Sequence, residues 1–132
     1  MSRAPARPSE RRARGLAAEA RAAAWLEEQG WEILDRNHVC RRGEVDIVAS
    51  KGDTLVFVEV RSRTGTGFGH PLESISFRKR RRVIAAATDW AVRANLLNQR
   101  FIRFDVITVI DRGEGEDELH WIEGAFDAEG AC

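Results

Sequence analysis

Apolar positions recur at helical spacing near the start of the chain and predict a helix over residues 10–29. Ser9 is the expected N-cap, and Gly30 is the expected stop. Glu19 lies beside the apolar stripe, a turn ahead of Ala23. The stripe that we expect to face the core comprises Leu16, Ala20, Ala23 and Leu26.

The pattern then changes to short runs rich in Val, Ile and Phe, which are typical of strands. The first run covers residues 31–37, and two more cover residues 44–50 and 54–62. A glycine-rich loop is expected over residues 63–70.

Helical spacing returns after Pro71 and predicts a second helix that ends at about Leu97. A fourth strand follows over residues 101–110, then a polar turn over 112–118 and a short edge strand over 119–126. The order α-β-β-β-α-β predicts an α/β fold, with a central mixed sheet flanked by helices. The second helix is expected to bury Ile75, Val83, Ala86 and Trp90.

The composition is that of a soluble protein with one domain. The chain has 132 residues, of which 43% are hydrophobic and 32% are charged. No apolar run reaches the roughly 18–20 residues of a membrane span, and the N-terminus has no apolar segment of a secretory signal. Two cysteines are too few for a disulfide framework, so we expect a cytoplasmic location.

The formal net charge is zero, but the charges are segregated along the chain. Residues 1–14 hold five arginines and one glutamate, which predicts a basic, flexible arm. Residues 15–110, the expected α/β domain, hold 15 bases and 12 acids. Residues 111–132 hold one base and eight acids and form an acidic C-terminal segment. Such asymmetry favours a polyanionic partner or an acidic interaction tail.

The middle hairpin brings acidic residues together. Glycine at the first central position of the turn over residues 51–54 predicts a two-residue type II′ turn. That turn sets Asp46 opposite Glu59, and Glu44 opposite Arg61. Because side chains alternate along a strand, all four share one face.

Two interpretations of this face remain open. Opposed carboxylates roughly 4.5–5.5 Å apart repel, and a divalent cation would remove the conflict. The simpler alternative is a half-exposed polar face with a Glu44–Arg61 pair. Phe57 and Val48 on the same face indicate that it is partly covered. Glu19 would then need a partner in the core, unless it is a boundary residue of its helix.

The spacing of Asp46 and Glu59-Val60-Arg61, with 12 residues between them, resembles the PD-(D/E)XK nuclease signature. The α-β-β-β-α-β order resembles the restriction-endonuclease-like core of that superfamily. A wider set of residues over roughly 15–127 is similar to the YraN family of uncharacterised bacterial proteins, which is related to Holliday junction resolvases. The residues that carry this wider resemblance are Gly15, Glu19, Ala20, Gly30, Asn37, Gly43 to Asp46, Phe57 to Arg63, Gly69, Pro71, Glu73, Lys79 and Arg103 to Ile107.

The resemblance implies hydrolysis of phosphodiester bonds in branched or structured DNA with Mg²⁺ or Mn²⁺. It implies that Asp46 and Glu59 are metal ligands, together with the Val60 carbonyl. Glu44 and Glu19 would be additional acidic groups.

One position departs from the family pattern, because Arg61 stands where the usual residue is lysine. Arginine stays protonated, so it can orient or stabilise charge but cannot help to activate water. The chain has two lysines. Lys51 lies in the turn at the far end of the hairpin, and Lys79 lies on the second helix between Ile75 and Val83, on the side expected to face the sheet. We hypothesise that Lys79 supplies the missing ammonium. The alternative is a phosphate-binding or helix-capping charge.

A run of five cations covers every side of the second helix, so one solvated face cannot hold all of them. Phosphate contacts from these arginines would give sequence-independent, salt-sensitive binding. The arginines expected to contact nucleic acid are Arg63, Arg78, Arg80, Arg81 and Arg82.

Three functions are therefore consistent with the sequence. The first is a metal-dependent endonuclease acting on structured DNA. The second is a nucleic-acid-binding module without efficient catalysis, which Arg61 favours. The third is an interaction protein whose acidic tail docks a partner. A homodimer is possible by analogy with resolvases that act on two-fold substrates.

Overall fold

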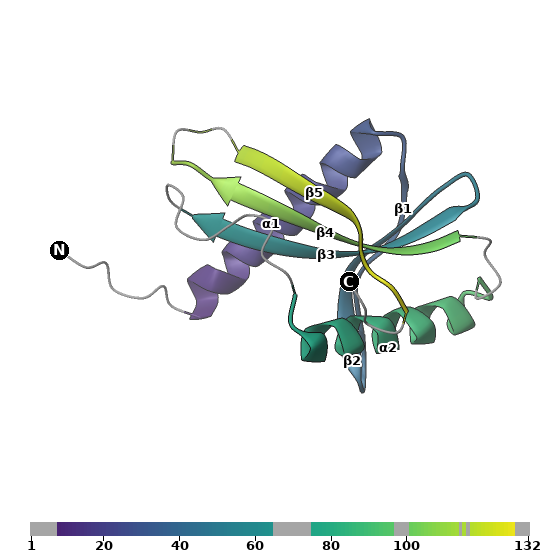
Figure 1. Ribbon diagram of the computed structural model, residues 1–132. Helices are drawn as coiled ribbons and strands as arrows, with labels where there is room; N and C mark the ends of the chain where they lie inside the picture. Colours follow the sequence, from purple (N-terminus) through teal and green to yellow (C-terminus); the bar gives the residue numbers. More distant parts are fainter. Residues whose placement is uncertain (1–7, 65–74, 97–100, 114, 116, 129–132) are drawn as a thin grey trace.

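The apolar runs pair into one five-stranded sheet in the computed structural model, which describes residues 8–64, 75–96, 101–113, 115 and 117–128 (Figure 1). The strand order is β1-β2-β3-β4-β5, and only the β3–β4 pair is parallel. The predicted α/β class with a mixed sheet between helices is confirmed. In chain order the elements are α1 (Pro8–Glu28), β1 (Glu32–Cys40), β2 (Gly43–Lys51), β3 (Thr54–Thr64), α2 (Phe77–Arg93), β4 (Phe101–Asp111) and β5 (Asp117–Phe126).

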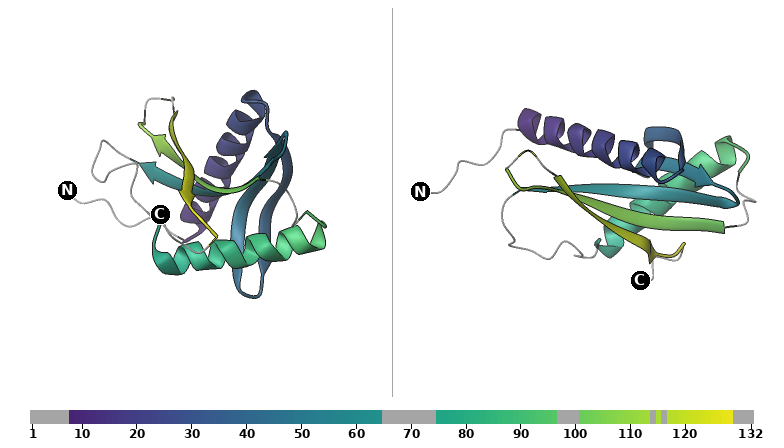
Figure 2. Two further views of the ribbon diagram at one scale, coloured as in Figure 1. Left: turned by 45° about the vertical axis from the view of Figure 1, so that its right-hand side comes forward. Right: turned by 90° about the horizontal axis from the view of Figure 1, so that it is seen from above.

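The two helices cover opposite faces of the sheet (Figure 2). Alternation along β3 shows this directly, because Leu55 and Phe57 belong to the core under α2. Val56 and Val58 belong to the core under α1. Because β3 is buried on both faces of the sheet, its sequence is a nearly continuous apolar run.

The first helix begins at Pro8, so Ser9 lies inside it and the predicted N-cap is wrong. Proline suits the first helical turn, because its missing N–H has no helical partner there. Gly30 ends the helix as predicted, with a φ of 93° that favours glycine.

The buried stripe of α1 differs from the predicted one. Leu16 is 47% exposed and Ala20 is also exposed, whereas Ala23 and Leu26 are buried as expected. The prediction placed Leu16 on the apolar stripe by its helical spacing alone. Small side chains instead line the contact with the sheet, and Glu19 is buried among them. The stripe comprises Ala18, Ala22, Ala23 and Leu26.

The second helix is shorter than predicted. Ser76 is its N-cap, and the Ser76 Oγ accepts a hydrogen bond from the Lys79 backbone N–H at 3.2 Å. The helix therefore cannot begin directly after Pro71, and it ends at Arg93 with Ala94 as the C-cap. All four residues of its predicted stripe are buried, although Ile75 precedes the first turn. Residues 65–74, which hold most of the predicted glycine-rich loop, lie outside the described residues.

The acidic C-terminal residues contain a complete edge strand. β5 pairs antiparallel with β4 from Asp117 to Phe126. Asp105 on β4 is fully buried and accepts hydrogen bonds from the Trp121 indole at 2.8 Å and the Gly124 backbone N–H at 2.9 Å. Arg103 donates two more at 2.9 Å, so this carboxylate joins β4 to β5. Within the described residues, no helix combines the length and apolar character needed to cross a bilayer.

Candidate active site: a carboxylate cluster where the sheet divides

The β2–β3 ladder has the predicted register but stops early. Lys51 pairs with Thr54 and Val48 with Phe57, and the last pair is Ile47 with Val58. Beyond that pair the β1–β2 hairpin curves away from β3 and runs alongside α2 (Figures 1 and 2). The sheet therefore divides beside Asp46 and Glu59.

A side chain replaces the missing backbone partner at this division. The Val60 N–H donates to Asp46 Oδ2 at 2.8 Å. In a continued ladder it would donate to the backbone of Val45. The N–H and C=O of one strand residue point to the same neighbouring strand, so the Val60 carbonyl also faces the division.

Asp46 and Glu59 form a buried carboxyl pair. Glu59 is only 6% exposed, and burial is the largest cause that raises its pKa to about 8. The charge of Asp46 raises the Glu59 pKa further, while the ammonium of Lys79 opposes the shift. Burial also raises the pKa of Asp46, against the Val60 hydrogen bond. A hydrogen bond between the two side chains lowers the pKa of Asp46 and raises that of Glu59, so Glu59 is the member of the pair that holds a proton more tightly.

Lys79 from α2 points into this pair. Its Nζ lies 3.1 Å from Glu59 Oε1 and 3.4 Å from Glu44 Oε1. Burial lowers the pKa of Lys79, but the two carboxylates outweigh burial and the net direction is upward. Lys79 is therefore held as a cation. An ammonium of this kind neutralises and orients charge, and it is a poor proton acceptor.

Glu19 approaches from the opposite layer. Its side chain is 8% exposed, and burial raises its pKa, followed by the charge of Asp46. Arg36 and a hydrogen bond with the Asn37 side chain oppose that shift. Asn37 has a φ of 55° on β1 and lies across the ladder from Asp46. Sequence patterns assign no site role to Asn37 or Arg36, although asparagine is uncommon inside a strand and signals an unusual backbone position.

The cluster has the donors that a hard cation prefers. Among the described residues, Glu59 Oε2 and Glu19 Oε1 are buried without a hydrogen-bond partner. A buried oxygen of this kind needs a proton or a cation. Nowhere in the described part of the chain do three or more His, Cys, Asp or Glu side chains form a preformed metal-binding group. Two carboxylates with a backbone carbonyl and waters is nevertheless an ordinary set for Mg²⁺, so the residues fit.

The remaining predicted site residues lie around the cluster. The ladder ends before it could set Glu44 opposite Arg61, and Glu44 contacts Lys79 instead. Arg61 and Arg63 are half-buried on β3, beside Thr108 and Ile110 of β4. The cationic run divides, because Lys79 faces the carboxylates while its neighbours point elsewhere. Arg78, Arg81 and Arg82 are exposed, and Arg80 is half-buried.

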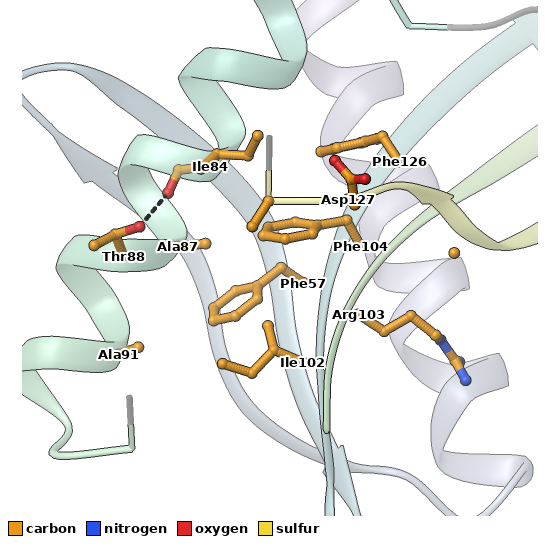
Figure 3. Close-up of a pocket in the computed structure, with 12 residues that line it drawn as sticks. Phe57, Ile84, Ala87, Thr88, Ala91, Ile102, Arg103, Phe104, Phe126 and Asp127 are labelled. Carbon is orange, nitrogen blue, oxygen red and sulfur yellow. Dashed lines mark hydrogen bonds between the residues drawn. The ribbon is translucent and has the colours of Figure 1, made fainter. Parts of the chain in front are cut away.

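A cavity of about 440 Å³ lies between α2 and the strands β4 and β5 (Figure 3). The rings of Phe57 and Phe104 stack there, with centroids 5.7 Å apart, and Ala87 and Ala91 face them from α2. No residue of the carboxylate cluster lines this cavity. Its walls are mostly apolar, and they offer none of the acid–base groups of the carboxylate cluster.

Comparison with known proteins places the chain among bacterial relatives. The sequence pattern of the uncharacterised protein family UPF0102 matches residues 18–109. A UPF0102 protein of Anaeromyxobacter dehalogenans is 54% identical over 91% of this chain and 88% of its own length. One of Myxococcus xanthus is 50% identical, over 93% and 96%. One of Pseudomonas aeruginosa is 47% identical, over 89% and 94%.

Proposed function

Because the chain belongs to the uncharacterised protein family UPF0102, we propose a function from the site itself. This membership confirms the predicted YraN family and says nothing about activity. We propose a metal-dependent nuclease that hydrolyses phosphodiester bonds in branched or otherwise structured DNA. The observation that carries the proposal is the buried Asp46–Glu59 pair with the Lys79 ammonium against it.

The metal ligands would be Asp46, Glu59 and the Val60 carbonyl. When bound there, Mg²⁺ or Mn²⁺ would lower the pKa of a coordinated water and polarise a phosphoryl oxygen. The raised pKa of Glu59 supports the assignment, because a carboxyl pair that retains a proton when metal-free can exchange it for a cation.

Lys79 and Arg61, the two cationic side chains of the proposed site, have different roles. Lys79 keeps its proton, neutralises Glu59 and Glu44, and stabilises negative charge that develops on a phosphate. Arg61 is a permanent cation on the same strand as Glu59 and orients the phosphate. Glu19 has a raised pKa, so its buried oxygen is a better proton acceptor than that of an exposed glutamate.

The test is cleavage by the purified chain. Branched, flapped and linear DNA are incubated with Mg²⁺ or Mn²⁺, and parallel samples contain EDTA. Cleavage of branched or flapped DNA that requires metal and disappears in Asp46→Asn and Glu59→Gln would support the proposal. Equal cleavage by these variants would identify a contaminating nuclease and refute it.

A second candidate is a nucleic-acid-binding module with the same fold. Arginine at position 61 favours it, because the chain lacks the titratable lysine of the family pattern there. Tight binding of DNA in EDTA, with no cleavage in either metal, would support this module over the nuclease.

A further inference from the structure

A basic groove runs along the outer side of α2. It encloses about 400 Å³, which is within the roughly 300–1,000 Å³ typical of small-molecule sites. Among the described residues that line it, four are arginines, one is aromatic, and none is acidic. The groove is lined by Arg42, Phe77, Arg78, Arg81, Arg82 and Ala85.

Phe77 presents its ring at the surface of this groove. It is the first residue of α2 and is 54% exposed. The guanidinium carbons of Arg80 and Arg81 lie 5.7 Å and 5.9 Å from the ring centroid. An aromatic ring with guanidinium groups over it forms a flat layer that can stack with another π-system and attract an anion.

The groove and the carboxylate cluster share the first turns of α2. Lys79 reaches Glu59 on the inner side, while Arg78, Arg81 and Arg82 line the groove on the outer side. Between them, Gly43 of the β1–β2 turn packs directly on the backbone of Arg82. The two residues that flank Gly43 belong to the two sites, because Arg42 lines the groove and Glu44 contacts Lys79 in the cluster. The groove and the cluster are therefore neighbours on either side of this turn.

We propose that this groove binds an unpaired nucleotide strand, with its phosphates on the arginines and a base against Phe77. This inference rests on the proposed nuclease, since it places the neighbouring nucleotides of a strand held at the carboxylate cluster. A duplex keeps the faces of its bases inside the stack, so an aromatic ring gains little from it. An unpaired base exposes its face, and stacking on an aromatic side chain contributes roughly 1–3 kcal/mol per base.

The test measures binding without cleavage. Fluorescence anisotropy in EDTA compares labelled single-stranded DNA, single-stranded RNA and duplex DNA of one sequence. We expect Phe77→Leu to weaken binding of a single strand roughly fivefold or more, the lower limit of one stacked base, and to change duplex binding less than about twofold. Phe77→Trp should retain single-strand binding. Phe101→Leu is the matched control, because Phe101 is 53% exposed on β4.

The arginines predict a different pattern. Arg81→Gln should weaken single-strand and duplex binding together and reduce the salt dependence by about one ion. Comparison of the affinities for single-stranded DNA and single-stranded RNA then identifies whether the groove prefers a deoxyribose or a ribose strand.

Equal effects of Phe77→Leu and Phe101→Leu would overturn the inference, as would equal losses for single strand and duplex. These outcomes are independent of the nuclease proposal, since binding is measured in EDTA. Cleavage that survives Asp46→Asn would refute the nuclease proposal alone. Thermal melting of each variant confirms that it is folded.

Discussion

Gly43 is the position where a single methyl group should disturb the site most. A Cβ there would lie 1.9 Å from the carbonyl oxygen of Arg82, and 2.6 Å and 2.9 Å from its carbonyl carbon and Cα. These are helix backbone atoms, which cannot rotate away as a side chain does. Ordinary contact begins at 3.4 Å, so α2 and the hairpin must separate by about 1.5 Å in Gly43→Ala.

The separation has two expected effects. Overpacking of this kind costs about 1–3 kcal/mol of folding free energy. Lys79 lies one turn before Arg82 on the same helix, so its 3.1 Å contact with Glu59 should lengthen. Urea denaturation measures the first effect, and cleavage or metal binding at equal folded fraction measures the second.

Gly15→Ala is the matched control. Gly15 lies in α1, and the added carbon would meet nothing within 4 Å beyond its chain neighbours and the backbone of its own helix. Alanine is favoured over glycine inside a helix by roughly 0.5–1 kcal/mol, so this variant should be unchanged or slightly more stable. A Gly43→Ala protein with the stability and denaturant slope of the parent would show that the hairpin does not press on α2, and would refute the reasoning.

Three further predictions concern the buried charges. The pKa of Glu59 is raised from 4.5 to about 8, so the metal-free folded protein holds a proton that the unfolded chain releases between these values. The stability of the folded protein should therefore fall as pH rises through this window, by at most about 5 kcal/mol from this group. Urea denaturation in EDTA at several pH values should show a smaller fall for Glu59→Gln than for the parent. Parallel profiles of stability against pH for the two proteins would contradict the prediction. Lys79→Ala should lower single-turnover cleavage with Mg²⁺ roughly a hundredfold to a thousandfold, while Lys79→Arg should retain part of the activity. Full activity of the alanine variant would exclude a role of Lys79 in the reaction. Asp105→Ala should cost about 3–5 kcal/mol in urea denaturation, because it removes the acceptor of the Trp121 indole and the closer of the two carboxylates that pair with Arg103. Asp53→Ala in the exposed turn should cost almost nothing.

The fold was largely predictable because its signals are local. Gly30 and Gly52 mark a helix end and a hairpin turn, and the turn fixes the register from Lys51–Thr54 to Ile47–Val58. The buried face of α1 was not predictable by periodicity, since Leu16 and Ala20 are as apolar as the residues that are buried.

The sequence predicted which residues form the site better than it predicted how they are arranged. The hairpin register placed Asp46 and Glu59 together, and helical spacing placed Lys79 toward the sheet. The β2–β3 ladder ends at the Ile47–Val58 pair, and beyond it the Asp46 side chain accepts the Val60 N–H in place of a backbone carbonyl. No local sequence pattern predicts this change. The approach of Glu19 from α1 to Asp46 likewise comes from tertiary packing, which no local pattern reports.

The acidic side chains of the edge strand β5 should oppose pairing of this edge with another sheet. An open strand edge is a template for pairing with another chain, and charged side chains on an edge oppose such pairing. β5 occupies the open side of β4 and displays Asp117, Glu118 and Glu123 at the surface. Truncation after Arg112 would expose the backbone of β4 and remove Phe126 from the core, so the shortened chain should aggregate.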